Sequence, residues 1–177
     1  YMISNSEIVT LRAIERKDLP LIQKWRNMPS IQPFVREYRE LSLGHIENWY
    51  ESTLTDNRFE FFMILDKKTG MQIGIAGLTY IDWKNKHADL HLGLYEVPWA
   101  DEHFGEDVMN TMLDLGYNHF NLNKIYAEVY EIDKEKVKLF INHNFNIDAE
   151  LREHYFYKGK YVNSLILSLL KSEYEKY

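Results

Sequence analysis

Residues 87–145 constrain the fold more than any other part of this 177-residue chain. Over residues 87–95, small and aliphatic side chains alternate with His, Asp, Gly and Tyr, which is the period of a β-strand with one face in a core and the other facing something polar. Residues 104–120 then carry an apolar stripe with helical spacing, residues 124–131 predict a second strand, and residues 134–143 predict a short helix. Strands and helices in this order predict a sheet with helices packed against it.

The rest of the chain extends this pattern in both directions, and Asp18 is placed to cap the first helix. We expect strands over 8–14, 59–65 and 72–81, helices over 18–29 and 43–54, a loop or irregular helix over 31–41, turns over 66–70 and 82–86, and a final pair of strands from 145 to 170 around the turn at Gly159. No linker or change of composition divides the chain. Residues 1–177 are therefore expected to form a single α+β domain with a mixed sheet.

The composition is that of an ordinary globular domain, and it excludes several functions. Hydrophobic residues make up 45% of the chain, and the lack of cysteine excludes a disulfide scaffold and thiol chemistry by the protein itself. The formal net charge of -6 argues against a nucleic-acid partner, which needs Lys and Arg to neutralise phosphates, and suits a cationic or neutral small molecule. No apolar run approaches the ~20 residues of a membrane span and residues 1–10 lack a signal-peptide pattern, so we expect a cytoplasmic protein without a membrane partner.

Two features of the central segment bear on ligands. A helix that begins directly after a strand presents unpaired backbone N–H groups, which suit a phosphate group. His87 and His91 are not expected to bind a metal, because four-residue spacing suits a helix face and these residues lie on a predicted strand with no cysteine or third ligand nearby.

Six short motifs spread over nearly the whole chain are informative together. They are Thr-Leu-Arg-Ala-Ile-Glu-Arg-Lys-Asp-Leu-Pro at 10–20, Trp-Arg-Asn at 25–27, Ile-Gly-Ile-Ala-Gly-Leu at 73–78, Leu-Asn-Lys-Ile at 122–125, Leu-Arg-Glu-His at 151–154 and Lys-Gly-Lys-Tyr at 158–161. This set resembles the GNAT acyltransferases, in the branch that contains ribosomal-protein N-terminal acetyltransferases. The resemblance implies a single GNAT-like α+β domain with a mixed central sheet of about seven strands, splayed between the fourth and fifth strands and flanked by about four helices.

The resemblance further implies that acetyl-CoA is the cosubstrate and that its pantetheine pairs with the fourth strand, at Leu92, Gly93 and Leu94. A glycine in a strand can equally relieve crowding against an aromatic ring, so both explanations of Gly93 stay open. The family's pyrophosphate loop corresponds to residues 100–105, where only the last glycine of the family pattern is kept. The residues implied as cofactor contacts near this loop and in the short helix are His103, Phe104, Gly105, Glu106, Asp133 and Phe140. His103 is equally a plain surface histidine, Asp133 is equally a helix N-cap, and Phe140 stands where the family often has a tyrosine that protonates the leaving thiolate.

The reaction implied by the resemblance is the aminolysis of a thioester by a primary amine. His91 and Asp89 share the polar face of the fourth strand and are the expected bases, with His91 preferred because its unperturbed pKa of about 6.5 lies near neutrality. Backbone near Leu92 is expected to stabilise the oxyanion. Tyr130 is expected to protonate the thiolate, with Tyr95 as the alternative.

The acceptor amine is the least determined part of the prediction. The Trp-Arg-Asn motif and the helix with Trp49 are most similar to enzymes that acetylate amino groups of nucleotide-linked sugars, and the C-terminal half is also similar to spermidine N-acetyltransferases. The expected acceptor contacts are Trp25, Arg26, Glu37, Tyr38 and Glu40. An amino sugar nucleotide is therefore the expected acceptor, with a protein N-terminus or a polyamine as alternatives. A GNAT-fold protein that binds or regulates without catalysis is a further alternative, and we expect a monomer or a homodimer.

Overall fold

The structure is a computed structural model that describes residues 6–98 and 102–175. Its described residues form one seven-stranded sheet with the strand order β1-β2-β3-β4-β5-β7-β6. All neighbouring strands are antiparallel except β4 and β5, which are parallel. The strands are β1 Val9–Ala13, β2 Glu60–Asp66, β3 Gln72–Asp82, β4 His87–Leu94, β5 Lys124–Tyr130, β6 Asn146–Tyr157 and β7 Lys160–Leu170.

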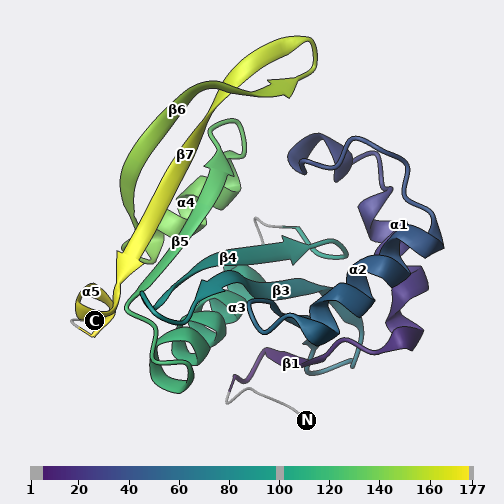
Figure 1. Cartoon of the computed structure of the whole chain (residues 1–177), viewed down its shortest axis with the longest axis horizontal. Coiled ribbons are helices and arrows are strands. Elements are labelled where there is room, and N and C mark those ends of the chain that lie inside the picture. The colour runs from purple at the N-terminus through teal and green to yellow at the C-terminus, as the bar shows by residue number, and fades with distance from the viewer. Residues whose placement is uncertain (1–5, 99–101, 176–177) are drawn as a thin grey trace.

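Helices lie on both faces of this sheet, as Figure 1 shows. They are α1 Leu19–Arg26, α2 Leu43–Thr55, α3 Glu102–Asp114, α4 Lys134–Asn142 and a short α5 Lys171–Tyr174. A π-helical turn, Leu115–His119, continues α3, so the long helix predicted over 104–120 is confirmed with a slightly earlier start. The segment between α1 and α2 contains a 3-10 turn, Gln32–Phe34, and is otherwise irregular, as expected.

Two hydrophobic clusters pack against opposite faces of the sheet. The larger cluster contains Val108 and Met112 of α3 together with the buried side chains of β4, and the smaller one contains Trp25 of α1 and Ile46 of α2. Ala88, Leu90, Leu92 and Leu94 all point into the larger cluster. The predicted alternation of β4 is therefore confirmed, and it leaves Asp89 and His91 on the face shared with α1 and α2.

The sheet is split between β4 and β5. Only residues 87–89 of β4 pair with β5, at residues 124–126, whereas β5 stays paired with β7 over its whole length. Residues 90–94 and 127–130 therefore run apart, and Figure 1 shows β4 turning away from the β5–β7–β6 half of the sheet. The predicted mixed α+β fold, splayed between the fourth and fifth strands, is confirmed.

Two local predictions need correction or refinement. Asp18 stands at the N-cap position of α1 but makes no capping hydrogen bond with its side chain. Its buried carboxylate instead accepts two hydrogen bonds from Arg12, at 2.7 and 2.9 Å, and one from Gln72 at 2.7 Å. At Gly93, β4 has no irregularity in its pairing with β3, and a Cβ atom would lie 2.3 Å from the hydroxyl oxygen of Tyr95. Crowding against an aromatic ring thus explains Gly93.

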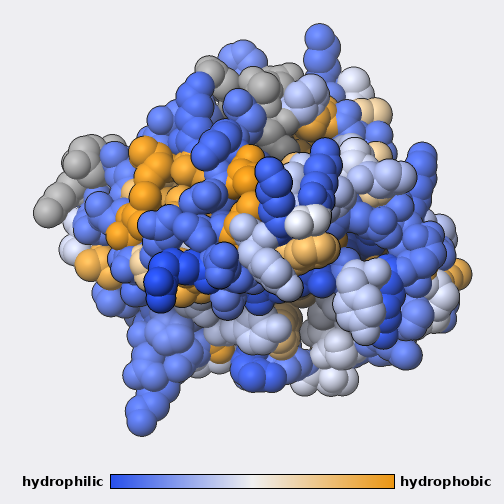
Figure 2. All heavy atoms as spheres, turned by 90° about the horizontal axis from the view of Figure 1, so that it is seen from above, coloured by the Kyte–Doolittle hydropathy of each residue, from blue (hydrophilic) through white to orange (hydrophobic). Residues whose placement is uncertain are grey.

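The surface is mainly hydrophilic on the face shown in Figure 2, with hydrophobic side chains gathered in small patches between charged ones. Within residues 6–98 and 102–175, no helix is long and apolar enough to cross a membrane.

Candidate active site

The gap between β4 and β5 contains a lysine that the sequence analysis did not single out. Lys136 of α4 reaches across the gap and donates a hydrogen bond from Nζ to the carbonyl oxygen of Leu92, at 3.0 Å. This carbonyl lies beyond the last residue of β4 that pairs with β5. The lysine therefore takes the place that a neighbouring strand would have, and it satisfies a buried backbone acceptor that β5 leaves unpaired.

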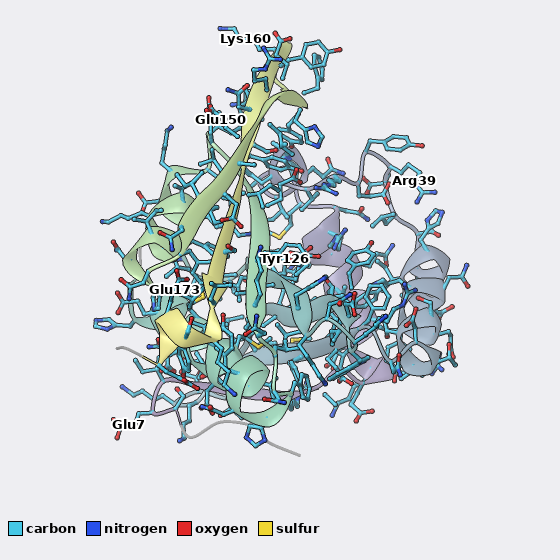
Figure 3. The ribbon with its side chains drawn as sticks, turned by 60° about the vertical axis from the view of Figure 1, so that its left-hand side comes forward. Glu7, Arg39, Tyr126, Glu150, Lys160 and Glu173 are labelled. Atoms are coloured by element: carbon cyan, nitrogen blue, oxygen red, sulfur yellow. The ribbon has the colours of Figure 1, made fainter. Side chains whose placement is uncertain are left out.

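Asp89 lies at the point where the two strands separate, because it is the last residue of β4 that pairs with β5, opposite Tyr126. Figure 3 shows Tyr126 in the middle of the molecule, between the long hairpin and the rest of the sheet. Burial raises the pKa of Asp89 to about 6, although the positive charges of Arg36 and Lys136 oppose the shift. A carboxylate with this pKa can accept a proton near neutral pH.

His91 follows on the same face of β4, with its ring centre 5.9 Å from that of Phe61. Burial, together with the positive charges of Lys136 and Arg26, lowers the pKa of His91 to about 3. The imidazole is thus neutral and weakly basic, and the reason for preferring it over Asp89 as the base is wrong. Its neutral ring can still donate or accept a hydrogen bond.

A cavity of about 340 Å³ opens beside His91, within the size range of small-molecule sites. Its floor comes from β2, β3 and β4, and its walls come from α1, α2 and the loop between them. The lining residues are Ile22, Arg26, Glu37, Arg39, Leu41, His45, Ile46, Asn48, Trp49, Phe61, Ile75 and His91. Polar and apolar side chains contribute equally to this lining, so the cavity offers charged and hydrogen-bonding groups beside an apolar surface.

The three residues of the Trp-Arg-Asn motif have three different positions. Trp25 is fully buried, with Nε1 donating to Glu96 at 2.7 Å, so it supports the wall and does not contact the cavity. Arg26 lines the cavity, and its buried Nε atom has no hydrogen-bond partner in the part of the chain that the structure describes. Asn27 binds both the backbone N–H and the carbonyl of Leu41, each at 2.8 Å, and so fixes the end of the loop.

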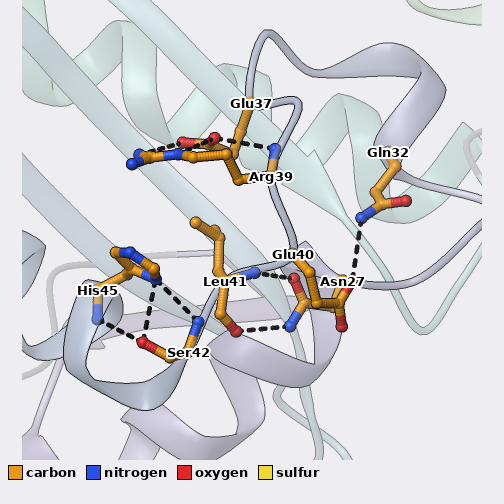
Figure 4. Close-up of polar contacts among 8 residues, drawn as sticks. All are labelled: Asn27, Gln32, Glu37, Arg39, Glu40, Leu41, Ser42 and His45. Atoms are coloured by element: carbon orange, nitrogen blue, oxygen red, sulfur yellow. Dashed lines mark hydrogen bonds and ion pairs between the residues drawn. The ribbon is translucent and has the colours of Figure 1, made fainter.

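The loop between α1 and α2 supplies two charged groups to the cavity, and Figure 4 shows its polar contacts. Arg39 donates to both carboxylate oxygens of Glu37, at 2.8 and 3.1 Å, which holds the pKa of Glu37 at about 2. Tyr38 is 90% exposed and Glu40 contacts Gln32. Neither residue lines the cavity, although both were predicted to contact the acceptor. Of the three loop residues expected as acceptor contacts, only Glu37 lines the cavity.

Arg36 of the same loop reaches the other half of the sheet. Its guanidinium forms an ion pair with Glu128 of β5 and a hydrogen bond with Tyr130. Burial raises the pKa of Tyr130 despite this bond, and its ring stacks on Tyr155 at 3.6 Å between ring centres. Tyr130 therefore lies on the β5 side of the gap, where burial outweighs the effect of Arg36 and makes its hydroxyl a weaker acid than a free tyrosine.

The start of α3 carries the residues expected to hold the diphosphate. His103 and Glu106 are exposed, Phe104 packs against the core and Gly105 is buried in the first turn of the helix. Ala100 and Asp101 of the same motif lie outside the described residues. The backbone N–H groups at this helix start remain the predicted phosphate site.

In α4, Asp133 occupies the N-cap position, and burial raises the pKa of its carboxyl group. Phe140 is completely buried, with its ring centre 4.8 Å from that of Phe145. Phe140 thus belongs to the core, and its contact with the cofactor stays a prediction. Lys136 and Phe140 are one turn apart on α4, so helical spacing around Phe140 is the signal that could have indicated Lys136.

The fold and the site together define an α+β protein with a ligand-sized cavity beside a split in a mixed sheet. Residues 9–146 match the model of the acetyltransferase (GNAT) domain. The chain therefore belongs to the GNAT acetyltransferase family, and the predicted family and enzyme class are confirmed.

Named relatives extend this similarity over most of the chain. The spermidine N(1)-acetyltransferase of Vibrio cholerae serotype O1 is 29% identical over 174 residues, which cover 96% of each protein. Acetyltransferase PseH of Campylobacter jejuni subsp. jejuni is 22% identical over 142 residues, which cover 80% of this chain and 85% of that protein. Among solved structures, spermidine N-acetyltransferase from Vibrio cholerae in complex with CoA and spermine has a TM-score of 0.86 at 27% identity, and the match covers 94% of this chain and 98% of that chain.

Proposed function

We propose that this protein transfers the acetyl group of acetyl-CoA to the primary amine of a small molecule. The observation that carries the proposal is the split between β4 and β5 next to Asp89, with the cavity at His91 beside it. An extended pantetheine can pair with the backbone of residues 90–94, which does not pair with β5, and an amine in the cavity then lies on the face of β4 that carries Asp89. The complex of a similar enzyme with CoA supports the choice of donor.

In the proposed reaction, the amine nitrogen attacks the carbonyl carbon of the thioester. The new C–N bond forms, the C–S bond breaks, and the electron pair of that bond goes to sulfur. Asp89 accepts the proton that the amine loses, either directly or through a water molecule, because its pKa of about 6 leaves it ionised at neutral pH. Backbone N–H groups of β4 near Leu92 remain the proposed stabilisers of the oxyanion.

The charges of the cavity favour an acceptor that carries an anionic group. Arg39 is neutralised by Glu37, whereas the buried Nε of Arg26 has no hydrogen-bond partner in the described part of the chain. A buried guanidinium atom without an acceptor is costly, and a phosphate or carboxylate oxygen would satisfy it. We therefore propose an amino sugar nucleotide as the acceptor. A polyamine is the second candidate, because a relative at 29% identity is named a spermidine acetyltransferase.

The direction in which Arg26→Gln changes the KM of the acceptor distinguishes these two candidates. Thiol release from acetyl-CoA is measured with a nucleotide-linked amino sugar, the free amino sugar, spermidine and a short peptide. For the nucleotide-linked sugar, Arg26→Gln should raise KM about tenfold, because one charge-assisted hydrogen bond is lost, and leave KM for acetyl-CoA unchanged. If spermidine is the acceptor, the same substitution should lower its KM, because a repelling charge has been removed.

Arg16→Gln is the matched control, since Arg16 is exposed, pairs with Glu51 and does not line the cavity. Thiol release with none of these amines, together with no calorimetric binding of acetyl-CoA, would contradict the proposal and favour a protein that uses the fold without catalysis.

A further inference from the structure

Lys136 is a side chain of α4 that reaches across the gap between β4 and β5. It does so through a hydrogen bond to the backbone of β4. Its Nζ lies 3.0 Å from the carbonyl oxygen of Leu92, on the unpaired part of β4. Leu92 is buried and a buried carbonyl without a donor is costly, so this contact keeps the ammonium inside the gap. Lys136 thus contacts the same backbone segment that is proposed to bind the acyl donor.

The charges around Lys136 form a local set of acids and bases. Burial lowers the pKa of Lys136, while the negative charges of Asp133 and Asp89 oppose the shift. Burial has the opposite effect on Asp89 and raises its pKa to about 6. Neighbouring groups whose environments move their pKa values toward neutrality are suited to proton exchange during a reaction.

The reaction needs a proton or a positive charge at the sulfur atom when the thiolate leaves. The hydroxyls near the gap are poorly suited to this step, because burial raises the pKa of Tyr130, Tyr126 and Tyr95. Phe140, in the core, has no proton to donate. An ammonium group differs from these hydroxyls in bringing both a proton and a charge opposite to that of the thiolate.

We propose that Lys136 protonates the leaving thiolate during acetyl transfer. This inference rests on the proposed function. When the C–S bond breaks, its electron pair stays on sulfur, and a proton passes from Nζ of Lys136 to that sulfur. Asp89 holds the proton taken from the attacking amine, and its return to Lys136, directly or through water, restores both groups for the next cycle.

The test compares two acyl donors that differ in how much their leaving groups need a proton. Lys136→Gln keeps an N–H donor for the Leu92 carbonyl but has no ionisable proton, and Lys136→Arg keeps the charge but is too weak an acid. With acetyl-CoA, both variants should lose kcat by about a hundredfold or more, since general acid catalysis contributes about 10²–10⁴-fold. With nitrophenyl acetate, whose leaving group is stable as an anion, the rates should change less than about threefold.

Lys134→Gln is the control, because Lys134 is exposed on the same helix. Calorimetric binding of CoA and the melting temperature of each variant show whether the gap and the fold are intact. Equal losses with both donors, or no loss with acetyl-CoA, would overturn the role of Lys136 while leaving the proposed function in place. A wild-type protein that releases no thiol from acetyl-CoA with any amine would overturn the proposed function, and the role of Lys136 with it.

Discussion

The ion pair between Arg12 and Asp18 ties the first strand to the start of α1. Asp18 is only 1% exposed, and burial raises its pKa, but hydrogen bonds from Arg12 and from the backbone N–H of Glu15 lower it more, to a net value below the ordinary one. Asp18→Ala should lower the free energy of unfolding by about 3 kcal/mol, because Arg12 and Gln72 then lose their buried acceptor.

Urea unfolding at pH 7 checks this, with Asp56→Ala as the control, since the pair of Asp56 and Arg58 is exposed and should matter little. A carboxyl group with a lowered pKa stabilises the folded state above its unfolded pKa of about 3.8, so the difference between wild type and Asp18→Ala should shrink as the pH falls below about 4. A difference that stays constant down to pH 2 would contradict this account.

Asp89 should set the pH dependence of the reaction. With a pKa of about 6, its basic form appears as the pH rises through 6, so kcat/KM should rise over that range and level off above it. Asp89→Asn should remove this rise and lower kcat/KM by about a hundredfold.

The ionised form of Asp89, which the reaction needs, should also lower the stability of the folded state. A raised pKa means that the folded state binds the proton more tightly than the unfolded state, so the stabilising contribution of Asp89 is present below about pH 4 and is lost as the pH rises through about 6. At pH 7 the Asn variant should therefore unfold at a higher temperature than the wild type. A less stable Asn variant would show that the carboxylate is paired more tightly than its environment indicates.

Asp89 and His91 also show which site residues can be predicted from sequence. The alternation of β4 placed both on one face, and the structure confirms that arrangement. Which of the two is the stronger base could not be predicted, because their pKa values depend on burial and on the charges of Lys136, Arg36 and Arg26. These three residues lie far away in the sequence. Periodicity gives the face of a strand, whereas pKa values depend on tertiary contacts.

At the level of elements, the close pairing of β3 with β4 fixes the side of the gap that carries Leu92. Gly74 of β3 makes this pairing possible, because a Cβ atom there would lie 1.9 Å from the carbonyl oxygen of Gly93. Gly74→Ala should therefore lower the free energy of unfolding by about 2 kcal/mol or more, through displaced backbone. Gly44→Ala in α2 is the control, since its nearest atom would be 3.6 Å away, and calorimetric melting of both variants tests the contrast.

The elements themselves were largely predictable, whereas the contacts between them were not. Hydrophobic periods indicated β4, α3 and both halves of the final hairpin with nearly the observed bounds. The composition of the segment over 31–41 showed that it is irregular, but not that only Glu37 and Arg39 would line the cavity among its charged residues. An irregular loop has no period from which the direction of a side chain follows, and here ion pairs decide it.

At the level of the whole molecule, the loop between α1 and α2 joins the two halves of the split sheet. Phe34 contacts Tyr157 of the β6–β7 hairpin, with 5.8 Å between ring centres, and Arg36 pairs with Glu128 of β5. The same loop supplies Glu37 and Arg39 to the cavity. One segment thus contacts the β5–β7–β6 half of the sheet and lines the cavity beside β4, so its position links the two halves to the shape of the cavity.

Removal of the Arg36 contact should loosen this link without unfolding the domain. In Arg36→Gln, amide hydrogen exchange over residues 31–41 should accelerate about fivefold, because a partly exposed ion pair contributes about 1 kcal/mol against local opening. The pairing of β1 with β2, far from the loop, should exchange as in the wild type. Arg152→Gln, an exposed change on β6, should leave both regions unchanged. If exchange over 31–41 stays slow in Arg36→Gln, the contact of Phe34 with Tyr157 holds the loop alone, and Phe34→Ala should then produce the acceleration instead.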